Sequence, residues 1–165
     1  MTNILITGMS GTGKSSVLAA LAERGFRVVD TDEDGWREYR AYAEPLSEIH
    51  RGEFVWIEDR MRDLLSTEGD RALFVAGCVR NQSDFYDRFD AVVLLTAPAV
   101  VLLERIRRRT TNPYGKSDVE RAMILDDLEH IEPLLRAGAT HELDASRPLA
   151  DIVAELAVIA GSCAA

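Results

Sequence analysis

Residues 3–15 of this chain read NILITGMSGTGKS, and this stretch decides the fold. The first five residues are mostly apolar and β-prone, which indicates a buried strand. The other eight, from Gly8 to Ser15, fit the pattern G-x-x-x-x-G-K-[ST], and from Lys14 onward apolar residues recur at helical spacing. A strand, a glycine-rich turn and a helix in this order direct backbone N–H groups and the positive end of the helix dipole at an anion.

The glycine-rich turn, residues 8–15, is called the phosphate loop below, because its pattern predicts a site for the phosphates of a nucleotide. In that interpretation Lys14 reaches the β- and γ-phosphates of ATP, and the hydroxyl of Ser15 is a ligand of Mg²⁺. A dinucleotide fingerprint is excluded, because it needs Gly or Ala at the position of Ser16. The predicted nucleotide-binding residues in and next to the loop are Gly8, Ser10, Gly11, Thr12, Gly13, Lys14, Ser15 and Ser16.

Short apolar runs alternate with helical periodicity along the rest of the chain. This alternation predicts an α/β fold in one domain, a three-layer sandwich with a five-stranded parallel sheet between helices. Residues 36–67 are expected to form two helices that Pro45–Ser47 separate. The four further strands are expected at residues 26–29, 72–76, 91–96 and 141–143, and the remaining helices at residues 14–24, 98–109, 118–136 and 147–160.

Two carboxylates follow the predicted strand at residues 26–29, at the end of the sheet where ligands of such folds bind. Asp30 and Asp32 are two residues apart in an extended segment, so both side chains are expected to face the same way. One of the two carboxylates would hold a Mg²⁺-bound water, and the other would take a proton from the hydroxyl of the acceptor. The residue types alone leave open which of them has which role, and an ordinary acidic turn is the structural alternative.

The helix expected at residues 98–109 ends in several arginines. Arg105 and Arg109 are four residues apart and therefore lie on one face of that helix. Because phosphoryl transfer spreads negative charge over oxygen atoms, both arginines are candidate catalytic and nucleotide-binding residues. Stabilisation of the helix C-terminus is their alternative role. Residues 110–116 contain Asn-Pro and Gly and suit a mobile lid, at about residues 109–118, that excludes water.

The acceptor is expected near the end of the predicted strand at residues 72–76 and near an insertion at about residues 33–67. Gly77 directly follows that strand and permits close approach of a ligand. Arg80 would clamp an anionic acceptor, with an exposed surface arginine as the equal alternative. The insertion combines aromatic and basic residues, which suit a phosphorylated or ring-bearing acceptor, and Trp36 is the candidate selected from it.

Composition excludes several classes of protein. The chain has 165 residues, of which 47% are hydrophobic and 28% charged, as in a folded globular domain. Its formal net charge of −9 argues against wrapping of duplex nucleic acid, which needs a basic surface. Cys78 and Cys163 fit neither a disulfide framework nor a zinc motif. Because a signal peptide and an apolar stretch of roughly 20 residues are both missing, we expect a cytoplasmic protein without a membrane partner.

Taken together, these motifs resemble those of the small P-loop kinases, which include shikimate, gluconate and nucleoside monophosphate kinases. The resemblance covers nearly the whole chain and implies a P-loop nucleoside triphosphate hydrolase fold with a small lid. Asp30 and Asp32 are similar to the two aspartates of shikimate kinases, of which the first assists Mg²⁺ and the second contacts the acceptor hydroxyl. Arg105 and Arg109 match arginines of adenylate kinases that pack on adenine and engage the transferred phosphate.

Two further parts of the resemblance concern the adenine and the acceptor. The segment 144–149, which contains Ser146 and Pro148, resembles the one whose backbone lies against adenine in these kinases, so both residues are carried over as nucleotide-binding. Gly77 and Arg80 match the Gly and Arg of the D-G-x-P-R element of adenylate kinases.

The resulting prediction is an ATP- and Mg²⁺-dependent phosphotransferase for a small-molecule acceptor, working as a monomer or homodimer. Asp32 favours a hydroxyl acceptor and Arg80 a phosphate acceptor, so a nucleoside monophosphate kinase is the first alternative. A nucleotide-dependent switch or regulatory NTPase is the second, although the guanine-reading N-K-x-D element is missing. Trp56 and Ile57 replace the Phe and Arg of shikimate kinases, which argues against shikimate as the acceptor.

Overall fold

The computed structural model describes residues 2–33, 35–44 and 51–164. A five-stranded parallel sheet forms the centre of this part of the chain. The strands lie in the order β2-β5-β1-β6-β7. The three central strands are buried almost throughout, as a parallel sheet with two covered faces requires. The expected α/β fold is therefore confirmed. The strands are β1 (Asn3–Thr7), β2 (Arg27–Asp30), β5 (Leu73–Ala76), β6 (Ala91–Thr96) and β7 (His141–Asp144).

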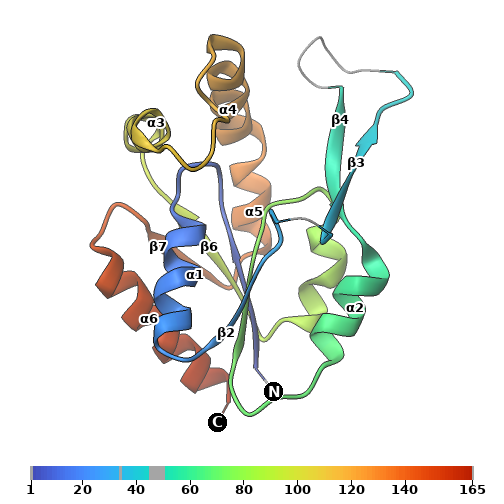
Figure 1. Cartoon of the computed structure of the whole chain (residues 1–165), viewed down its shortest axis with the longest axis vertical. Coiled ribbons are helices and arrows are strands. Elements are labelled where there is room, and N and C mark those ends of the chain that lie inside the picture. The colour runs from blue at the N-terminus through green and yellow to red at the C-terminus, as the bar shows by residue number, and fades with distance from the viewer. Residues whose placement is uncertain (1, 34, 45–50, 165) are drawn as a thin grey trace.

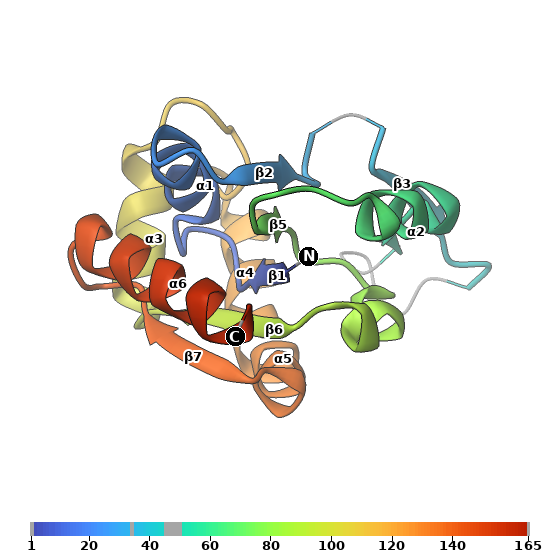
Figure 2. The ribbon, with the colours of Figure 1, turned by 90° about the horizontal axis from the view of Figure 1, so that it is seen from below.

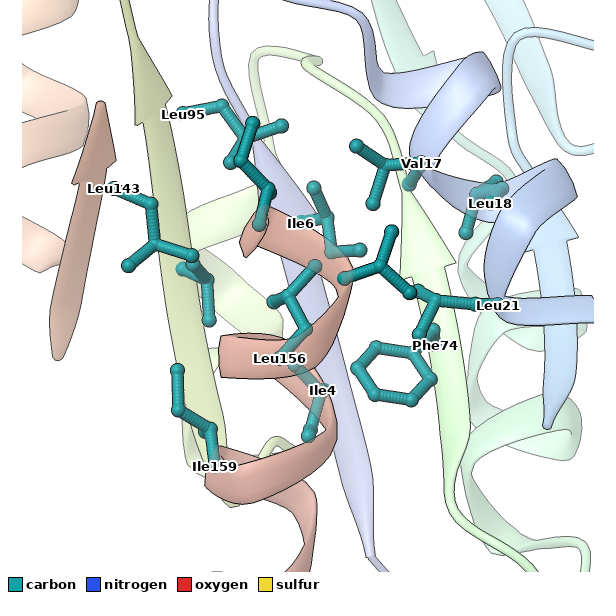
Figure 3. Packing of buried hydrophobic residues seen from close by; sticks show 14 of the residues in the cluster. Ile4, Ile6, Val17, Leu18, Leu21, Phe74, Leu95, Leu143, Leu156 and Ile159 are labelled. Carbon is teal, nitrogen blue, oxygen red and sulfur yellow. The ribbon is translucent and has the colours of Figure 1, made fainter. Parts of the chain in front are cut away.

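Helices cover both faces of the sheet (Figure 2), which completes the three layers. On one face lie α1 (Lys14–Glu23) and α6 (Leu149–Cys163). Figure 3 shows Leu21 of α1 and Leu156 of α6 against Ile4, Ile6 and Phe74 of the sheet. This layer fixes the start of α1, and with it the phosphate loop, over the end of β1.

The opposite face carries α2 (Glu58–Ser66), the 3-10 helix η1 (Gln82–Arg88) and α5 (Glu132–Gly138), and α3 (Ala99–Arg108) follows the end of β6. Met61 of α2 and Phe85 of η1 belong to the same buried cluster as Leu5 of β1. Leu102 of α3 packs in a second cluster with Leu94 of β6. Within the described part of the chain, no helix is long and apolar enough to cross a membrane.

The carboxyl ends of the strands form the upper edge of the sheet in Figure 1, and both termini lie at the opposite edge. Two arms project beyond this upper edge. One is built by α3 and α4 (Asp118–His130), and the other is a hairpin of β3 (Arg37–Ala41) and β4 (Gly52–Trp56) (Figure 1). The turn from β1 to α1 lies at the same edge, so any ligand of the phosphate loop has an arm on either side.

The expectation of two helices in residues 36–67 is wrong for the first of them. Residues 37–41 and 52–56 pair as antiparallel strands, and only α2 is helical in this stretch among the described residues. The expected break at Pro45–Ser47 lies outside the residues that the structure describes. The physical reason is the pairing of Tyr39 with Phe54 across the hairpin and the complete burial of Trp56, which anchors β4 on the core.

The helix expected at residues 118–136 is in fact two helices. Ile131 ends α4 and also precedes α5, whose first turn contains Pro133. A proline lacks the N–H that would continue the hydrogen-bond ladder of α4, but it is favoured in the first turn of a new helix. Helix η1 was not expected either, because its seven residues are too few for a periodic pattern.

Candidate active site

The phosphate loop is packed between the end of β6 and helix α3. Gly8 and Gly11 have φ angles of 146° and 88°, in the region that favours glycine. A Cβ atom on Gly8 would lie 2.4 Å from the carbonyl oxygen of Leu95, and one on Gly11 would lie 2.9 Å from that of Leu102. Thr12 is buried, and its hydroxyl donates to the carbonyl of Met9 at 2.9 Å. The loop is therefore fixed by its own backbone and by its neighbours before any ligand binds.

Lys14, the first residue of α1, folds back across the phosphate loop. Its Nζ donates to the carbonyl oxygens of Gly8 at 2.6 Å and Met9 at 3.3 Å. The ammonium group is thus held against the backbone at the first two residues of the loop. Both contacts are to neutral carbonyls, so the positive charge of Lys14 is available to an anion at this place.

The two aspartates after β2 meet the phosphate loop. The hydroxyl of Ser15 donates to Oδ2 of Asp30 at 2.8 Å, and the backbone N–H of Asp32 donates to Oδ1 of Asp30 at 3.0 Å. Ser15 and Asp30 are the two residues that the sequence assigned to Mg²⁺. A hydroxyl and a carboxylate in contact at a solvent-accessible edge fit this ion, which prefers oxygen ligands and retains several waters.

Asp32 has a partner that was not among the predicted site residues, namely Arg37 at the start of β3. The guanidinium of Arg37 donates to Oδ1 of Asp32 at 2.6 Å and to its backbone carbonyl at 3.3 Å. Arg37 also lies over the ring of Phe54, 4.2 Å from the ring centroid. Arg37 belongs to the aromatic and basic set of the insertion, but the strand that brings its side chain to Asp32 was not predicted.

Gly77 follows β5 and lies next to the site, but its own neighbours already require a glycine. A Cβ atom there would lie 2.1 Å from Oγ1 of Thr31 and 3.3 Å from the ring of Trp56. The indole N–H of Trp56 donates to Oγ1 of Thr31 at 2.9 Å, and that hydroxyl donates to the carbonyl of Ala76 at 2.8 Å. Gly77 therefore lets Trp56 pack against the segment that carries both aspartates.

The other two predicted acceptor residues, Trp36 and Arg80, contact groups other than Asp32. Trp36 is half-buried beneath the guanidinium of Arg60, at 4.8 Å. Arg80 is exposed, and its Nε lies 3.4 Å from Glu53. The structure gives neither residue a contact with Asp32.

The arginines at the end of α3 divide into two pairs. Arg109 donates to the hydroxyl of Ser10 at 3.2 Å and to the carbonyl of Tyr114 at 2.6 Å, and Arg105 donates to the carbonyl of Ala145 at 2.7 Å. By contrast, Arg107 and Arg108 both pair with Glu104 on the outer side of the helix. Arg105 and Arg109 are thus the two that reach the phosphate loop and the segment after β7.

One atom of Arg109 has no partner. Its Nε is buried and makes no hydrogen bond to any part of the chain that the structure describes. Burial also lowers the pKa of Arg109, although a guanidinium stays protonated at neutral pH. A buried donor without an acceptor costs free energy, and in Arg109 this donor belongs to the same guanidinium whose Nη2 bonds to Ser10 of the phosphate loop.

The segment that follows Arg109 is held to the end of α3 by Lys116. Its Nζ donates to the carbonyls of Ile106, Arg107 and Arg109 at 2.6, 2.7 and 2.7 Å. These carbonyls end the hydrogen-bond ladder of α3 and would otherwise lack a donor. Ser117 then starts α4 with a capping box that Glu120 completes, so the predicted lid segment is anchored at both ends.

The segment predicted to lie against adenine forms a tight turn. The backbone N–H and the hydroxyl of Ser146 donate to Oδ1 of Asp144, at 2.8 and 2.6 Å, and these bonds lower the pKa of Asp144. Pro148 lies just before α6. Since Arg105 bonds to Ala145, this turn lies beside the arginine that was predicted to pack on adenine.

Comparisons with known proteins bear on this geometry. A protein family described as AAA domain matches residues 4–126. Shikimate kinase from Acinetobacter baumannii in complex with shikimate superposes with a TM-score of 0.63 at 20% identity, covering 98% of this chain and 94% of that one. For deoxyadenosine kinase from M. mycoides with bound dATP the TM-score is 0.59 at 12% identity, with coverages of 96% and 98%. A gluconokinase from Sinorhizobium meliloti superposes with a TM-score of 0.56 at 23% identity, and the match covers 99% of this chain and 91% of that one.

No curated protein matches the chain. At the identities above, the solved structures show the fold, and their acceptors differ from one another. The family match is stronger, because it spans most of the sequence from β1 into α4. By this match the chain belongs to the AAA domain family, and it shares its fold with the solved kinases above.

Proposed function

We propose that the protein is a kinase that moves the γ-phosphoryl group of ATP to a hydroxyl of a small molecule. One observation carries this proposal: Ser15, which follows Lys14 in the phosphate loop, donates its hydroxyl to Asp30, and the same carboxylate accepts from the backbone N–H of Asp32. These contacts bring a place for the phosphates next to a residue whose carboxylate can take a proton. Transfer needs these two features at adjacent positions.

The bond between the γ-phosphorus and the bridging oxygen breaks, and ADP leaves with the bonding electron pair. The acceptor oxygen forms the new bond to phosphorus, and its proton passes to Asp32. Lys14, Arg105 and Arg109 would offset the negative charge on the phosphate oxygens during this exchange. A bound Mg²⁺ would be held by Ser15 and, through water, by Asp30, and would neutralise charge on the β- and γ-phosphates.

Two segments are assigned to this function. The insertion at about residues 33–67, which carries the hairpin, would receive the acceptor. The lid at about residues 109–118 would cover the nucleotide and exclude water, which otherwise takes the phosphoryl group. Location in the cytoplasm, and a monomeric or homodimeric state, stay predictions.

A nucleoside monophosphate kinase is the first alternative, and it would use Arg80 to hold the acceptor phosphate. The ion pair with Glu53 directs the exposed Arg80 towards strand β4, which favours the hydroxyl acceptor instead. A switch or regulatory NTPase is the second alternative, and it would hydrolyse ATP without any acceptor.

A transfer screen tests the proposal. The intact protein is incubated with Mg²⁺ and γ-labelled ATP against nucleosides, nucleoside monophosphates, sugars and sugar acids, while ATP hydrolysis is measured in parallel. We expect label on a hydroxyl-bearing acceptor and slow hydrolysis in its absence. Label on monophosphates alone would favour the first alternative, and hydrolysis that no acceptor changes would favour the second.

A further inference from the structure

One face of the β3–β4 hairpin carries an exposed row of ring-bearing and cationic groups. We call it the hairpin strip and define it as Arg37, Tyr39, Gly52 and Phe54. We propose that the hairpin strip binds the planar ring of the acceptor, so that the acceptor is an alcohol attached to a planar heterocycle, chemically a nucleoside. This inference rests on the proposed kinase function and adds the class of its acceptor.

The strand register places these residues on one face. Tyr39 pairs with Phe54, and Ala41 pairs with Gly52, in the antiparallel hairpin, while side chains of a strand alternate between its faces. The two rings meet edge to face, with centroids 5.3 Å apart and planes at 67°. A Cβ atom on Gly52 would lie 2.6 Å from the Tyr39 ring, so this glycine lets the ring lie over the strand.

Both rings are open to solvent. The exposed fraction is 53% for Tyr39 and 44% for Phe54, which places them among the large apolar side chains that the fold leaves uncovered. Trp56, the next residue on this face of β4, is by contrast completely buried. Trp56 therefore anchors the hairpin on the core, and the two exposed rings are not needed for this anchoring.

The hairpin strip is continuous with the phosphate loop. The guanidinium of Arg37 lies 4.2 Å from the centroid of the Phe54 ring and 2.6 Å from Oδ1 of Asp32. Asp32 in turn contacts Asp30, which contacts Ser15. A hydroxyl beside Asp32 therefore belongs to a molecule whose remaining body extends along Arg37 towards the two rings.

The chemistry of the two hairpin faces favours a ring over a polyol. A sugar acid would be held by hydrogen bonds from polar side chains. On the hairpin these side chains lie on the face opposite the hairpin strip, and they already bond to one another or to neighbouring residues. Arg40 pairs with Glu38, and Glu53 accepts from Tyr42 and pairs with Arg80. The hairpin strip offers ring faces and the flat side of a guanidinium, which are the surfaces on which heterocyclic bases stack.

The first arm of the test is direct binding. Adenosine and cytidine serve as ring-bearing probes, and gluconate and shikimate as non-aromatic ones. Their dissociation constants are measured by ligand-observed NMR on the intact protein with Mg²⁺ and ADP. We expect binding of a nucleoside, and we expect Tyr39→Leu to weaken that binding roughly tenfold. Tyr39 is the cleaner position, because Phe54 also contacts Arg37.

Controls separate stacking from loss of the fold. Phe54→Leu repeats the test at a second exposed ring, and Arg40→Gln changes the other face of the same strand as the matched control. Arg40→Gln should leave nucleoside binding unchanged, and all variants should keep the ATP dissociation constant and the melting temperature of the wild type. Nucleoside binding that survives both ring variants, or no nucleoside binding at all, would overturn the inference.

The second arm measures transfer from γ-labelled ATP to the same four probes. Transfer to a nucleoside that Tyr39→Leu slows supports the inference and the kinase function together. Transfer to gluconate or shikimate alone keeps the kinase function and overturns the inference. Nucleoside binding that depends on Tyr39, together with hydrolysis that no probe diverts, would keep the hairpin strip as a binding surface and overturn the kinase function instead.

Discussion

The guanidinium of Arg37 donates to Oδ1 of Asp32 at 2.6 Å, while Oδ2 of the same carboxylate has no contact with Arg37 among those the structure describes. This pairing fixes the direction of the carboxylate and leaves one oxygen for the acceptor hydroxyl that we propose. It also ties the hairpin to the end of β2, so that movement of the hairpin would move the candidate base.

Arg37→Gln is therefore expected to lower kcat/KM for the acceptor roughly 10- to 100-fold, because the carboxylate loses its fixed orientation. Exposed ion pairs contribute only about 0–1 kcal/mol, so the melting temperature should change little. Steady-state kinetics with ATP and with the acceptor check this, and Arg40→Gln is the control. An equal loss in the affinity for ATP would assign Arg37 to the nucleotide.

Lys14→Ala should lower transfer roughly 100-fold or more, because one fixed charge at the β- and γ-phosphates is lost. The fold should survive, since Lys14 contacts only the carbonyls of its own loop, at Gly8 and Met9. Transfer rate and thermal unfolding are the two measurements. Unchanged turnover in a folded Lys14→Ala protein would contradict the role of this lysine.

Asp32→Asn should slow transfer by roughly two orders of magnitude or more while leaving ATP binding close to that of the wild type. The amide keeps the shape of the side chain but cannot take the proton. Calorimetry with ATP and Mg²⁺, together with single-turnover transfer, separates the two effects. Loss of ATP affinity with a high residual rate would show that Asp32 serves the metal or the fold.

Gly77→Ala should destabilise the protein by about 1–3 kcal/mol, because the new methyl group would crowd Thr31 and Trp56. Gly161→Ala is the matched control. No atom lies within 4 Å of a Cβ atom at Gly161 in α6, so alanine there should stabilise the helix by about 0.5–1 kcal/mol. Urea unfolding of both variants measures the two shifts, and a neutral Gly77→Ala would contradict the crowding.

Glu104 should stay ionised far into the acid range. Its hydrogen bond from Arg107, and the nearby charge of Arg108, lower its pKa from 4.5 to about 2. The pairing therefore contributes stability above pH 4.5, and this contribution is lost as the pH falls from 4.5 towards about 2. An NMR titration of the side-chain carboxyl carbon checks the midpoint. Arg107→Gln should raise the pKa of Glu104, whereas Arg147→Gln, which changes an arginine outside α3, should leave this pKa unchanged.

Much of the architecture could be predicted because burial leaves a simple pattern. The central strands are continuous apolar runs between helices, and the phosphate loop has an unambiguous spacing of glycines with Lys14. Parallel strands also end at one edge, so Ser15 and Asp30 could be expected to meet. Helical spacing alone predicted that Arg105 and Arg109 lie on the same face of α3, and that Arg107 lies on a different face.

The hairpin could not be predicted for an equally physical reason. Residues 37–41 are mostly polar and exposed, and they form a strand only because Tyr39 meets Phe54 and because Trp56 is buried in the core. These are contacts between distant parts of the chain, and no local pattern encodes them. Arg37 was missed together with the strand that carries it. The reason for Gly77 was missed as well, because it depends on Trp56 packing over Thr31.

The two lysines of the sequence, Lys14 and Lys116, both hold backbone carbonyls, one set in the phosphate loop and the other at the end of α3. Among side chains, a reagent that acylates amines therefore has only these two targets. Peptide mass spectrometry after such labelling measures the extent of acylation at Lys14 and at Lys116 separately in one experiment. Protection of Lys14 would report uptake of a triphosphate, and a change at Lys116 would report release of the segment that it ties down.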